Sequence, residues 1–281
     1  MSSCVPKPLL ELIESTLGRR PNGSPRTISG GCIHQCIRWG NYFIKTNTLD
    51  HSRNFACEAD GLTAIAKTGT IRTPEVLAIG NSETHAVLIL EYLELYPSGD
   101  EARLGAALAE LHQHTHSTHG YHESNFIGAT PQPNHPHENW PGFFSSQRIE
   151  PMLNLLHARG IQIRGAEELL ARMPELLPSD VQPSLLHGDL WGGNKSFLSD
   201  GTPVLFDPAC YYGHACADLA MTTLFGGFGN RFYDSYRLHA PSSFDHPSLY
   251  DFYNIYHLLN HAVLFGGGYS RQAEAVISRY L

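Results

Sequence analysis

The pattern of apolar and polar residues divides the chain into a strand-rich first part and a mostly helical remainder. Apolar runs bounded by turn residues predict five short strands. These strands are expected at 26–31, 32–39, 41–47, 74–80 and 85–93. Gly40-Asn41, between the second and the third, is typical of a hairpin turn. Helical spacing over 6–17 precedes the strands and stops at Gly18, and a second helical pattern lies at 53–69.

Beyond residue 94 the spacing of apolar residues is mostly helical. Helical patterns lie at 102–114, 141–159 and 165–177, and four more finish the chain. The segment 116–140, rich in His, Pro, Asn and Gly, is expected to be a long loop, and such loops are often functional. Short strands at 195–198 and 203–206 are the exception to the helical character. The sequence therefore predicts an α+β, bilobal protein. A small five-stranded antiparallel lobe with one inserted helix occupies 1–94, and a larger, mostly α-helical lobe occupies 95–281.

Composition narrows the class of protein. The 281 residues are 42% apolar and 16% charged, a balance that can bury a globular core. The formal net charge of -8, with no Lys/Arg run, argues against a nucleic-acid partner. The N-terminal residues lack a signal-peptide pattern, and no apolar run has transmembrane length. Six Cys without a CxxC pair fit a reduced, cytoplasmic protein.

The stretch "HGDLWGGN" places His187, Asp189 and Asn194 on a loop, and Asp207 ends the following hairpin. Phosphoryl transfer needs such a set: one carboxylate accepts the proton of the substrate hydroxyl, and an amide oxygen and a second carboxylate hold Mg²⁺ on the phosphates of ATP. Alternatively, the segment is a turn with an Asx cap. That alternative accounts for each residue singly but not for their spacing, so we favour the kinase interpretation.

The strand-rich lobe offers the partners that a kinase requires. Lys45 lies near the middle of the third strand, and Glu58 lies on the helix that follows. In kinases such a pair clamps the α- and β-phosphates of ATP. Lys45 alone would more often be a solvated lysine. Gly30 and Gly31 are a weak phosphate-loop signal, because the chain has no GxxxxGK[ST] motif.

The run "VLILEYLEL" at 87–95 predicts the hinge between the lobes. We expect adenine to stack between apolar side chains there and to bond to backbone groups from Glu91 to Leu93. An ordinary buried strand would have the same pattern, and both interpretations can hold at once.

Several stretches together resemble the fructosamine kinase (ketosamine-3-kinase) family, which is related to the aminoglycoside and choline phosphotransferases. They include "SGGCI", "FIKTN", "FACEADGLTAI", "NFIGATPQPN", "ENWPGFF", "LLHGDLWGGN", "DPACYYGH" and "YHLLNHAVLFGGGY". The resemblance implies a protein-kinase-like fold and ATP-dependent phosphorylation of the sugar O3′ hydroxyl in ketosamines, the rearranged adducts of sugars with amines. Phosphorylation makes the adduct unstable, so the amine is released and glycation is reversed.

The resemblance also implies a role for individual residues. Asp189 is similar to the catalytic base, and Asn194 and Asp207 to the Mg²⁺ ligands. His187 would brace the catalytic loop, and Asp218 would bond to its backbone. The remaining roles concern ATP and the acceptor: Lys45 and Glu58 clamp the phosphates, while Trp191 and His261 lie at the sugar pocket.

Two cysteines raise separate questions. The family pattern has an acidic residue two positions after the His of "YYGH", where this chain has Cys216 after Ala215, so Cys216 receives no role. Cys32 follows Gly31 in the turn expected over the phosphates. As in family members with a cysteine there, it is a candidate for redox control, with the protein a monomer or a redox-dependent homodimer.

Other functions are weighed against this one. The same chemistry could serve an aminoglycoside or choline-type acceptor, although the loop at 130–143 is not strongly acidic. A pseudokinase scaffold would be expected to lose the base, the clamp or a metal ligand, and all five positions are filled here. His112 and His116 could share a helix face and bind a divalent metal, but a polar helix end is the favoured interpretation, since no further ligands complete a site.

Overall fold

The computed structural model describes residues 5–28 and 33–281, so the candidates Gly30, Gly31 and Cys32 lie outside the described residues. The chain divides into two compact units. The first comprises Met1–Asp100 and Ser196–Asp207, and the second comprises Glu101–Lys195 and Pro208–Leu281. The segment 196–207 thus groups with the first unit, which a single boundary after residue 94 does not anticipate.

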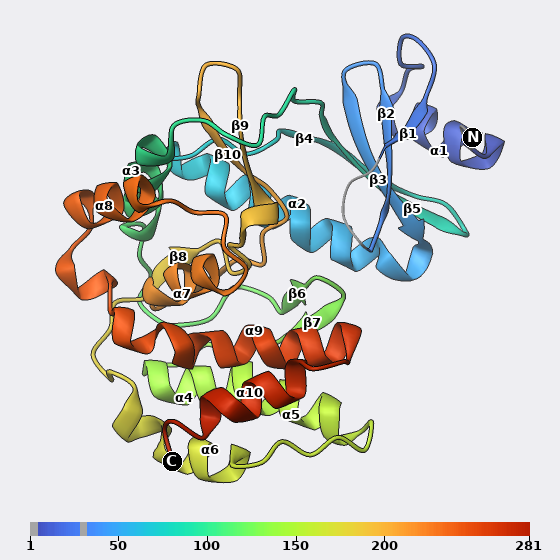
Figure 1. Ribbon diagram of the computed structural model, residues 1–281. Coiled ribbons are helices and arrows are strands. Elements are labelled where there is room, and N and C mark those ends of the chain that lie inside the picture. The colour runs from blue at the N-terminus through green and yellow to red at the C-terminus, as the bar shows by residue number, and fades with distance from the viewer. Residues whose placement is uncertain (1–4, 29–32) are drawn as a thin grey trace. The chain divides into compact units, whose positions relative to one another are not determined.

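The first unit contains a five-stranded antiparallel sheet, as predicted (Figure 1). Its strands lie in the order β1-β2-β3-β5-β4. They are β1 (Arg26–Ile28), β2 (Gln35–Trp39), β3 (Tyr42–Thr48), β4 (Val76–Asn81) and β5 (His85–Glu91). Trp39 pairs with Tyr42 across the turn at Gly40, whose φ of 60° lies in the left-handed region that glycine adopts most easily. The hairpin predicted at this glycine is therefore confirmed.

Two helices of the first unit match the predicted helical patterns. They are α1 (Lys7–Leu17) and α2 (Ser52–Thr68), the latter preceded by a 3-10 turn, η1 (Leu49–His51). Both helices end at a glycine in the left-handed conformation, Gly18 and Gly69. A left-handed glycine satisfies the last carbonyls of a helix at no steric cost, which explains why these apolar patterns stop where they do.

The sheet is covered on both faces, which gives each residue of β3 and β5 a defined direction. Ile89 belongs to the apolar cluster that contains α1, and Leu88 belongs to the cluster that contains α2. Successive residues of a strand point to opposite faces. Ile44 pairs with Ile89, and Lys45 pairs with Leu88. Lys45 therefore points to the face that α2 covers, where Glu58 lies.

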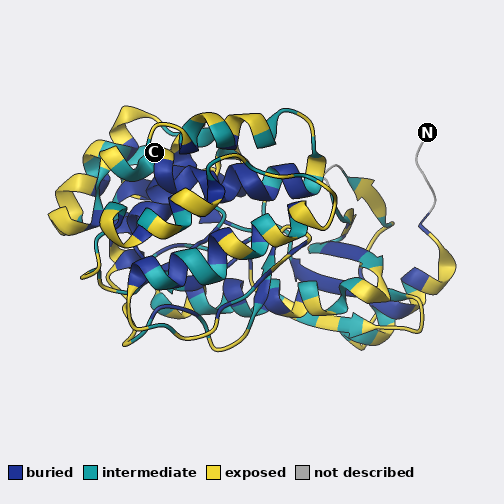
Figure 2. Cartoon of the chain, turned by 90° about the horizontal axis from the view of Figure 1, so that it is seen from below, coloured by how far each residue is buried: buried dark blue, intermediate teal, exposed yellow. Residues whose placement is uncertain are grey.

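The second unit is mostly helical. Its helices are α3 (Glu101–His112), α4 (Trp140–Phe144), α5 (Glu150–His157), α6 (Ala166–Leu176), α7 (Cys216–Leu224), α8 (Asn230–His239), α9 (Tyr250–Phe265) and α10 (Tyr269–Ile277). The last four confirm the four helical patterns at the end of the chain. α9 is apolar or buried on nearly all sides and is the centre of the core, and Figure 2 shows how the buried residues gather inside this unit.

One prediction for this unit is wrong. The segment 116–140 is not an unstructured loop, because β6 (Asn125–Ile127) and β7 (Thr130–Gln132) form a hairpin inside it. A strand of three residues is too short to show the alternation of apolar and polar residues by which a strand is recognised in a sequence. The helical pattern at 141–159 is confirmed, since α4 continues through a π-helical turn, η2 (Ser145–Ile149), into α5.

Short strands hold the loops that carry the candidate chemistry. β9 (Lys195–Phe197) and β10 (Pro203–Leu205) form the predicted hairpin. β8 (Ser184–Leu186) pairs with β11 (Tyr211–Gly213), which the sequence did not reveal. The chain passes from β8 into His187, and from Asp207 toward β11. Short 3-10 turns complete the fold: η3 (Gly192–Asn194), η4 (Ser242–Phe244) and η5 (Pro247–Leu249).

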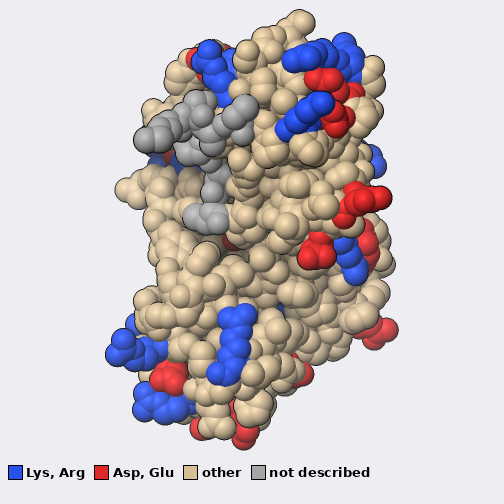
Figure 3. Space-filling model, turned by 90° about the vertical axis from the view of Figure 1, so that its right-hand side faces the viewer, with Lys and Arg blue, Asp and Glu red and all other residues tan. Residues whose placement is uncertain are grey.

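On the face shown in Figure 3, Lys and Arg side chains lie beside Asp and Glu side chains rather than in one basic patch. Within 5–28 and 33–281, none of the helices combines the length and the apolar character that crossing a membrane requires.

Candidate active site

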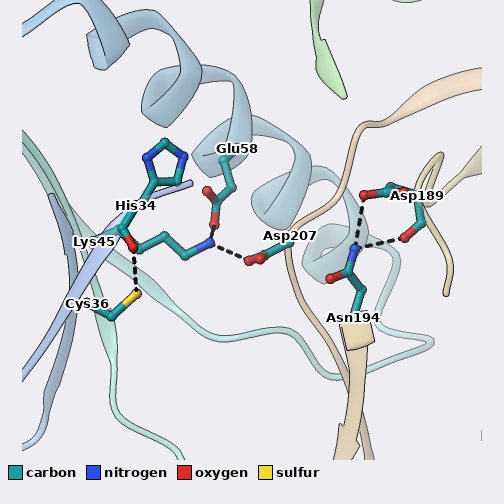
Figure 4. Close-up of polar contacts among 7 residues, drawn as sticks. All are labelled: His34, Cys36, Lys45, Glu58, Asp189, Asn194 and Asp207. Atoms are coloured by element: carbon teal, nitrogen blue, oxygen red, sulfur yellow. Dashed lines mark hydrogen bonds and ion pairs between the residues drawn. The ribbon is translucent and has the colours of Figure 1, made fainter. Parts of the chain in front are cut away.

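The first unit brings three of the predicted residues into contact. Lys45 Nζ donates to Glu58 Oε1 at 2.7 Å and also forms an ion pair with Asp207 (Figure 4). The Lys45 side chain is only 7% exposed. The strand alternation of β3 directs Lys45 toward α2, and the hairpin β9–β10 brings Asp207 to the same ammonium. The pairing of Lys45 with Glu58, which the kinase pattern predicts, is present in the structure.

Two carboxylates around one buried ammonium influence the protonation of all three groups. Burial acts to lower the pKa of Lys45, but the charges of Asp207 and Glu58 outweigh it and raise that pKa above its ordinary value. Burial raises the pKa of Glu58 to about 7; the charge of Lys45 opposes this rise, and that of Asp207 adds to it. Lys45 therefore remains a cation at neutral pH, as a phosphate clamp requires.

Asp207 has an unusual backbone conformation. Its φ of 57° makes it the non-glycine residue with a left-handed backbone among the residues described. Asp and Asn tolerate this region better than other side chains, and such conformations persist only where the surroundings hold them. The conformation turns the chain sharply after β10, at the residue predicted to bind a metal.

The second unit holds the catalytic loop through Asp218, in the first turn of α7. The Asp218 carboxylate accepts hydrogen bonds from the backbone N–H groups of His187, at 2.7 Å, and Gly188, at 2.9 Å. The backbone N–H of Asp189 donates to His187 Nδ1 at 3.3 Å. The loop that carries Asp189 is thus fixed by one buried carboxylate and one imidazole.

Gly188 is required for this arrangement. Its φ is 81°, and a Cβ at this position would lie 2.0 Å from the carbonyl oxygen of Ala209. The Ala209 N–H in turn donates to His187 O at 2.8 Å. The catalytic loop and the segment after Asp207 are therefore in direct backbone contact, which leaves no space for a side chain.

His112 is a supporting residue that the sequence did not identify. It is fully buried, with Nε2 3.3 Å from Asp218 Oδ2 and Nδ1 2.8 Å from the Tyr236 hydroxyl. Burial would raise the pKa of Asp218, but the hydrogen bond and charge of His112, with His187 and the Gly188 N–H, lower it. His112 ends α3 and His116 lies beyond it, so they do not share a helix face. The described residues include no group of three or more His, Cys, Asp or Glu placed to hold a metal.

Asn194 ends the short turn η3, and its side chain forms hydrogen bonds with Asp189, the candidate catalytic base. Its Nδ2 donates to the backbone oxygen of Asp189 at 2.9 Å and to Asp189 Oδ2 at 3.2 Å (Figure 4). These bonds orient the amide so that its oxygen is turned away from Asp189. The amide oxygen of Asn194 and the carboxylate of Asp207 are each a hard donor of the kind that Mg²⁺ prefers.

Trp191 and His261 are connected through an aromatic residue that the sequence analysis missed. The Trp191 ring lies edge to face with Phe225 at 6.1 Å, and Phe225 lies 4.7 Å from the His261 ring. Both Trp191 and Phe225 are partly exposed. The only available signal for Phe225 was its place before two glycines. A Cβ added at Gly192 would lie 2.8 Å from the carbonyl oxygen of Gly226, so the loop after Trp191 and the loop after Phe225 are in contact at these glycines.

The predicted adenine segment ends β5. The N–H of Glu91 already donates to Glu75 O, at 3.0 Å, and that of Tyr92 to Asn41 O, at 2.8 Å. The Glu91 carboxylate binds Arg72 and the Glu75 N–H. Within residues 5–28 and 33–281 the backbone N–H of Leu93 makes no hydrogen bond, so it is the candidate donor of this segment.

Two cysteines are unsuited to redox chemistry. Burial raises the pKa of the Cys36 thiol to about 11 and that of the Cys216 thiol to about 12. Cys216 donates to His246 O at 3.4 Å, and Asp245 lies near enough to add to its pKa. An acidic residue in place of Cys216 would thus bury a second carboxylate beside Asp245.

Comparison with known proteins places this geometry in a family. The model of the fructosamine kinase family matches residues 9–281. The chain belongs to the fructosamine kinase family. A probable ketoamine kinase of Synechocystis is 42% identical to this family member over 265 residues, 91% of this chain and 90% of the relative. A chloroplastic protein-ribulosamine 3-kinase of Oryza sativa subsp. indica is 40% identical over 268 residues, 91% of this chain and 78% of the relative.

The solved structures agree with this assignment. The crystal structure of a fructosamine-3-kinase family protein from Haemophilus somnus superimposes on this fructosamine kinase family member with a TM-score of 0.87 and 25% identity, covering 97% of this chain and 96% of the other. The predicted α+β, kinase-like fold is confirmed. The protein is a phosphotransferase that acts on a hydroxyl group, as the family implies.

Proposed function

We propose that this fructosamine kinase family member is an ATP- and Mg²⁺-dependent ketosamine 3-kinase, which phosphorylates the O3′ hydroxyl of sugar–amine adducts and so leads to deglycation. The observation that carries the proposal is the ion-pair cluster of the buried Lys45 with Glu58 and Asp207. A buried ion pair adds little stability by itself, and in kinases a Lys–Glu pair of this kind holds the phosphates of the nucleotide. The relatives named ketoamine kinase and ribulosamine 3-kinase support the choice of acceptor.

The nucleotide would be bound mainly by residues of the first unit. Lys45, oriented by Glu58, would hold the α- and β-phosphates, while the Leu93 N–H and the Glu91 carbonyl would bond to adenine. Gly30 and Gly31 stay predicted phosphate contacts. Asn194 and Asp207 would hold Mg²⁺, which supplies charge neutralisation on the β- and γ-phosphates when bound.

The transfer step would depend on Asp189. Its carboxylate accepts the proton of the O3′ hydroxyl as that oxygen attacks the γ-phosphorus; the bond from phosphorus to the bridging oxygen of ADP breaks, and ADP leaves. The Asn194 amide, bonded to Asp189 Oδ2, and the loop fixed by His187 and Asp218 would keep the base oriented toward the acceptor. Trp191 and His261 would border the sugar.

The experiment that tests the proposal is ³¹P NMR with Mg²⁺·ATP and three acceptors: ribuloselysine, fructoselysine and an aminoglycoside. A new sugar-phosphate signal with a ketosamine, lost in Asp189→Asn, supports the proposal and ranks the sugars. Phosphorylation of the aminoglycoside alone would assign another acceptor. ATP binding without transfer to any of the three would overturn the proposal in favour of a nucleotide-binding scaffold.

A further inference from the structure

The hairpin β6–β7, in the segment that sequence patterns left as a loop, supplies amide side chains to the core. Gln132 and Asn125 are 0% and 5% exposed. Gln132 Nε2 donates to Asn125 Oδ1 at 2.8 Å, and Gln132 Oε1 accepts a hydrogen bond from the Tyr256 hydroxyl at 2.7 Å. A buried amide with its partners satisfied has a fixed orientation, because any rotation would leave a polar atom unpaired.

The two amides also bind the backbone that follows Asp207. Gln132 Nε2 donates to Ala209 O at 3.0 Å, and Asn125 Nδ2 donates to Cys210 O at 2.8 Å. The Ala209 N–H donates to His187 O at 2.8 Å. Residues 209 and 210 are thus held on one side by the hairpin and on the other by the loop that leads to Asp189.

A buried arginine keeps the hairpin in place. The Arg148 guanidinium donates to Pro133 O at 2.6 Å and to Asn134 Oδ1 at 2.7 Å, and its carbon lies 3.9 Å from the centre of the Tyr211 ring. Asn134 Nδ2 in turn donates to Asn125 Oδ1 at 2.8 Å. The network therefore extends from the π-helical turn η2 to the segment between Asp207 and β11.

We propose that Gln132, with Asn125, is a positioning residue for phosphoryl transfer: it fixes residues 209–210 against the catalytic loop and thereby holds the left-handed backbone of Asp207. The inference rests on the proposed function, in which Asp207 binds Mg²⁺ and Asp189 is the base. Only Pro208 separates Asp207 from the segment that the amides fix, and a strained conformation needs such support. Neither amide is expected to touch substrate or nucleotide.

The test is Gln132→Met, which keeps the length of the side chain and removes its hydrogen bonds. We expect kcat to fall about 10- to 100-fold, because small misplacements of reacting groups have effects of this size. The half-saturating Mg²⁺ concentration should rise, while the Kd of metal-free ATP stays within about twofold of the wild type. Amide hydrogen exchange of the peptide spanning 208–212 should become faster.

Tyr253→Phe is the matched control. It removes buried hydrogen bonds to Trp140 Nε1, at 2.9 Å, and to His214 Nδ1, at 2.7 Å, in the same core, without touching residues 209–210. It should lower stability but leave kcat, the Mg²⁺ dependence and exchange at 208–212 unchanged. If Gln132→Met does not fold, Asn125→Ala replaces it with the same expectations. This variant removes the donor to Cys210 O and the oxygen that accepts from Gln132 and Asn134.

Two outcomes overturn the inference. A folded Gln132→Met protein with wild-type kcat and Mg²⁺ dependence would show that the amide only stabilises the core, as would a Tyr253→Phe protein with the same catalytic loss. The exchange measurement and the ratio of ATP affinities with and without Mg²⁺ need no acceptor. They remain decisive if ketosamines prove not to be substrates, so a failure of this inference is distinguishable from a failure of the proposed function.

Discussion

Asp218→Asn is the substitution whose effect follows most directly from the contacts in the structure. The carboxylate accepts hydrogen bonds from two backbone N–H groups, those of His187 and Gly188, with one oxygen each, and His112 shares the first oxygen. Asparagine offers one oxygen, and its own NH₂ would face an N–H. Losing one charge-assisted hydrogen bond costs about 1.5–3 kcal/mol, and the donor left unpaired costs about 1–3 kcal/mol.

These two effects overlap, so the expected loss in the free energy of unfolding is about 3 kcal/mol. For a chain of this size that corresponds to a fall in Tm of roughly 6–12 °C, since each kcal/mol shifts Tm by about 2–4 °C. Urea titration and thermal melting followed by circular dichroism measure the loss. Turnover per folded molecule should fall as well, because the loop that carries Asp189 is no longer fixed. Asp218 has a lowered pKa, so its contribution is present above the unfolded value of 3.8 and is lost as pH falls through the lower, folded value.

The control makes the same chemical change in the first turn of another helix. Asp251, in α9, pairs with Arg279 but is more than half exposed, so Asp251→Asn should cost well under about 1 kcal/mol. If Asp218→Asn unfolds within about 0.5 kcal/mol of the wild type and keeps its turnover, then the carboxylate is not what holds the loop. That result would also remove the reason for assigning His112 a supporting role.

Three further predictions concern the base, the metal ligand and acid stability. Asp189→Asn should lower kcat by at least about 10²- to 10⁴-fold with little change in ATP affinity by calorimetry; turnover surviving at the wild-type rate would mean that another group is the base. Asp207→Asn and Asp207→Ala should both abolish Mg²⁺-dependent turnover, but Ala should be the less stable in urea, since it tolerates the left-handed backbone poorly; equal stability would contradict strain at this residue. Burial lowers the pKa of both His214 and His257 to about 3, whereas in the unfolded chain these histidines have the ordinary pKa of 6.5. Below pH 6.5 the unfolded chain therefore binds more protons than the folded one, and the free energy of unfolding should fall as pH drops from 6.5 toward 3. His257→Leu should flatten that fall in Tm measured from pH 7 to 4, and an unchanged slope would contradict a neutral His257.

The sequence predicted the sheet well, and strand β5 most clearly, because both faces of β5 are covered, which gives a continuous apolar run. It also predicted that Lys45 meets Glu58, because a strand lysine followed by a helix glutamate is the kinase pattern. His112 and Gln132 could not be predicted in the same way. His112 bonds to Asp218 and Tyr236, and Gln132 bonds to Ala209 and Tyr256. These partners lie 77 to 124 residues away along the chain, and no local periodicity reveals such contacts. Phe225 was missed for the same reason: its partners are brought to it by tertiary packing.

The grouping of Ser196–Asp207 with the first unit has a consequence for how the protein can be made and divided. Phe197 is fully buried and packs so closely on Gly99 that a Cβ there would lie 2.3 Å from its ring. During synthesis on the ribosome the first hundred residues therefore cannot complete their unit until about a hundred more have emerged. A fragment ending at Asp100 would lack this cover and would be expected to aggregate rather than bind ATP. An autonomous version of the first unit would need the later hairpin rejoined to it by a linker.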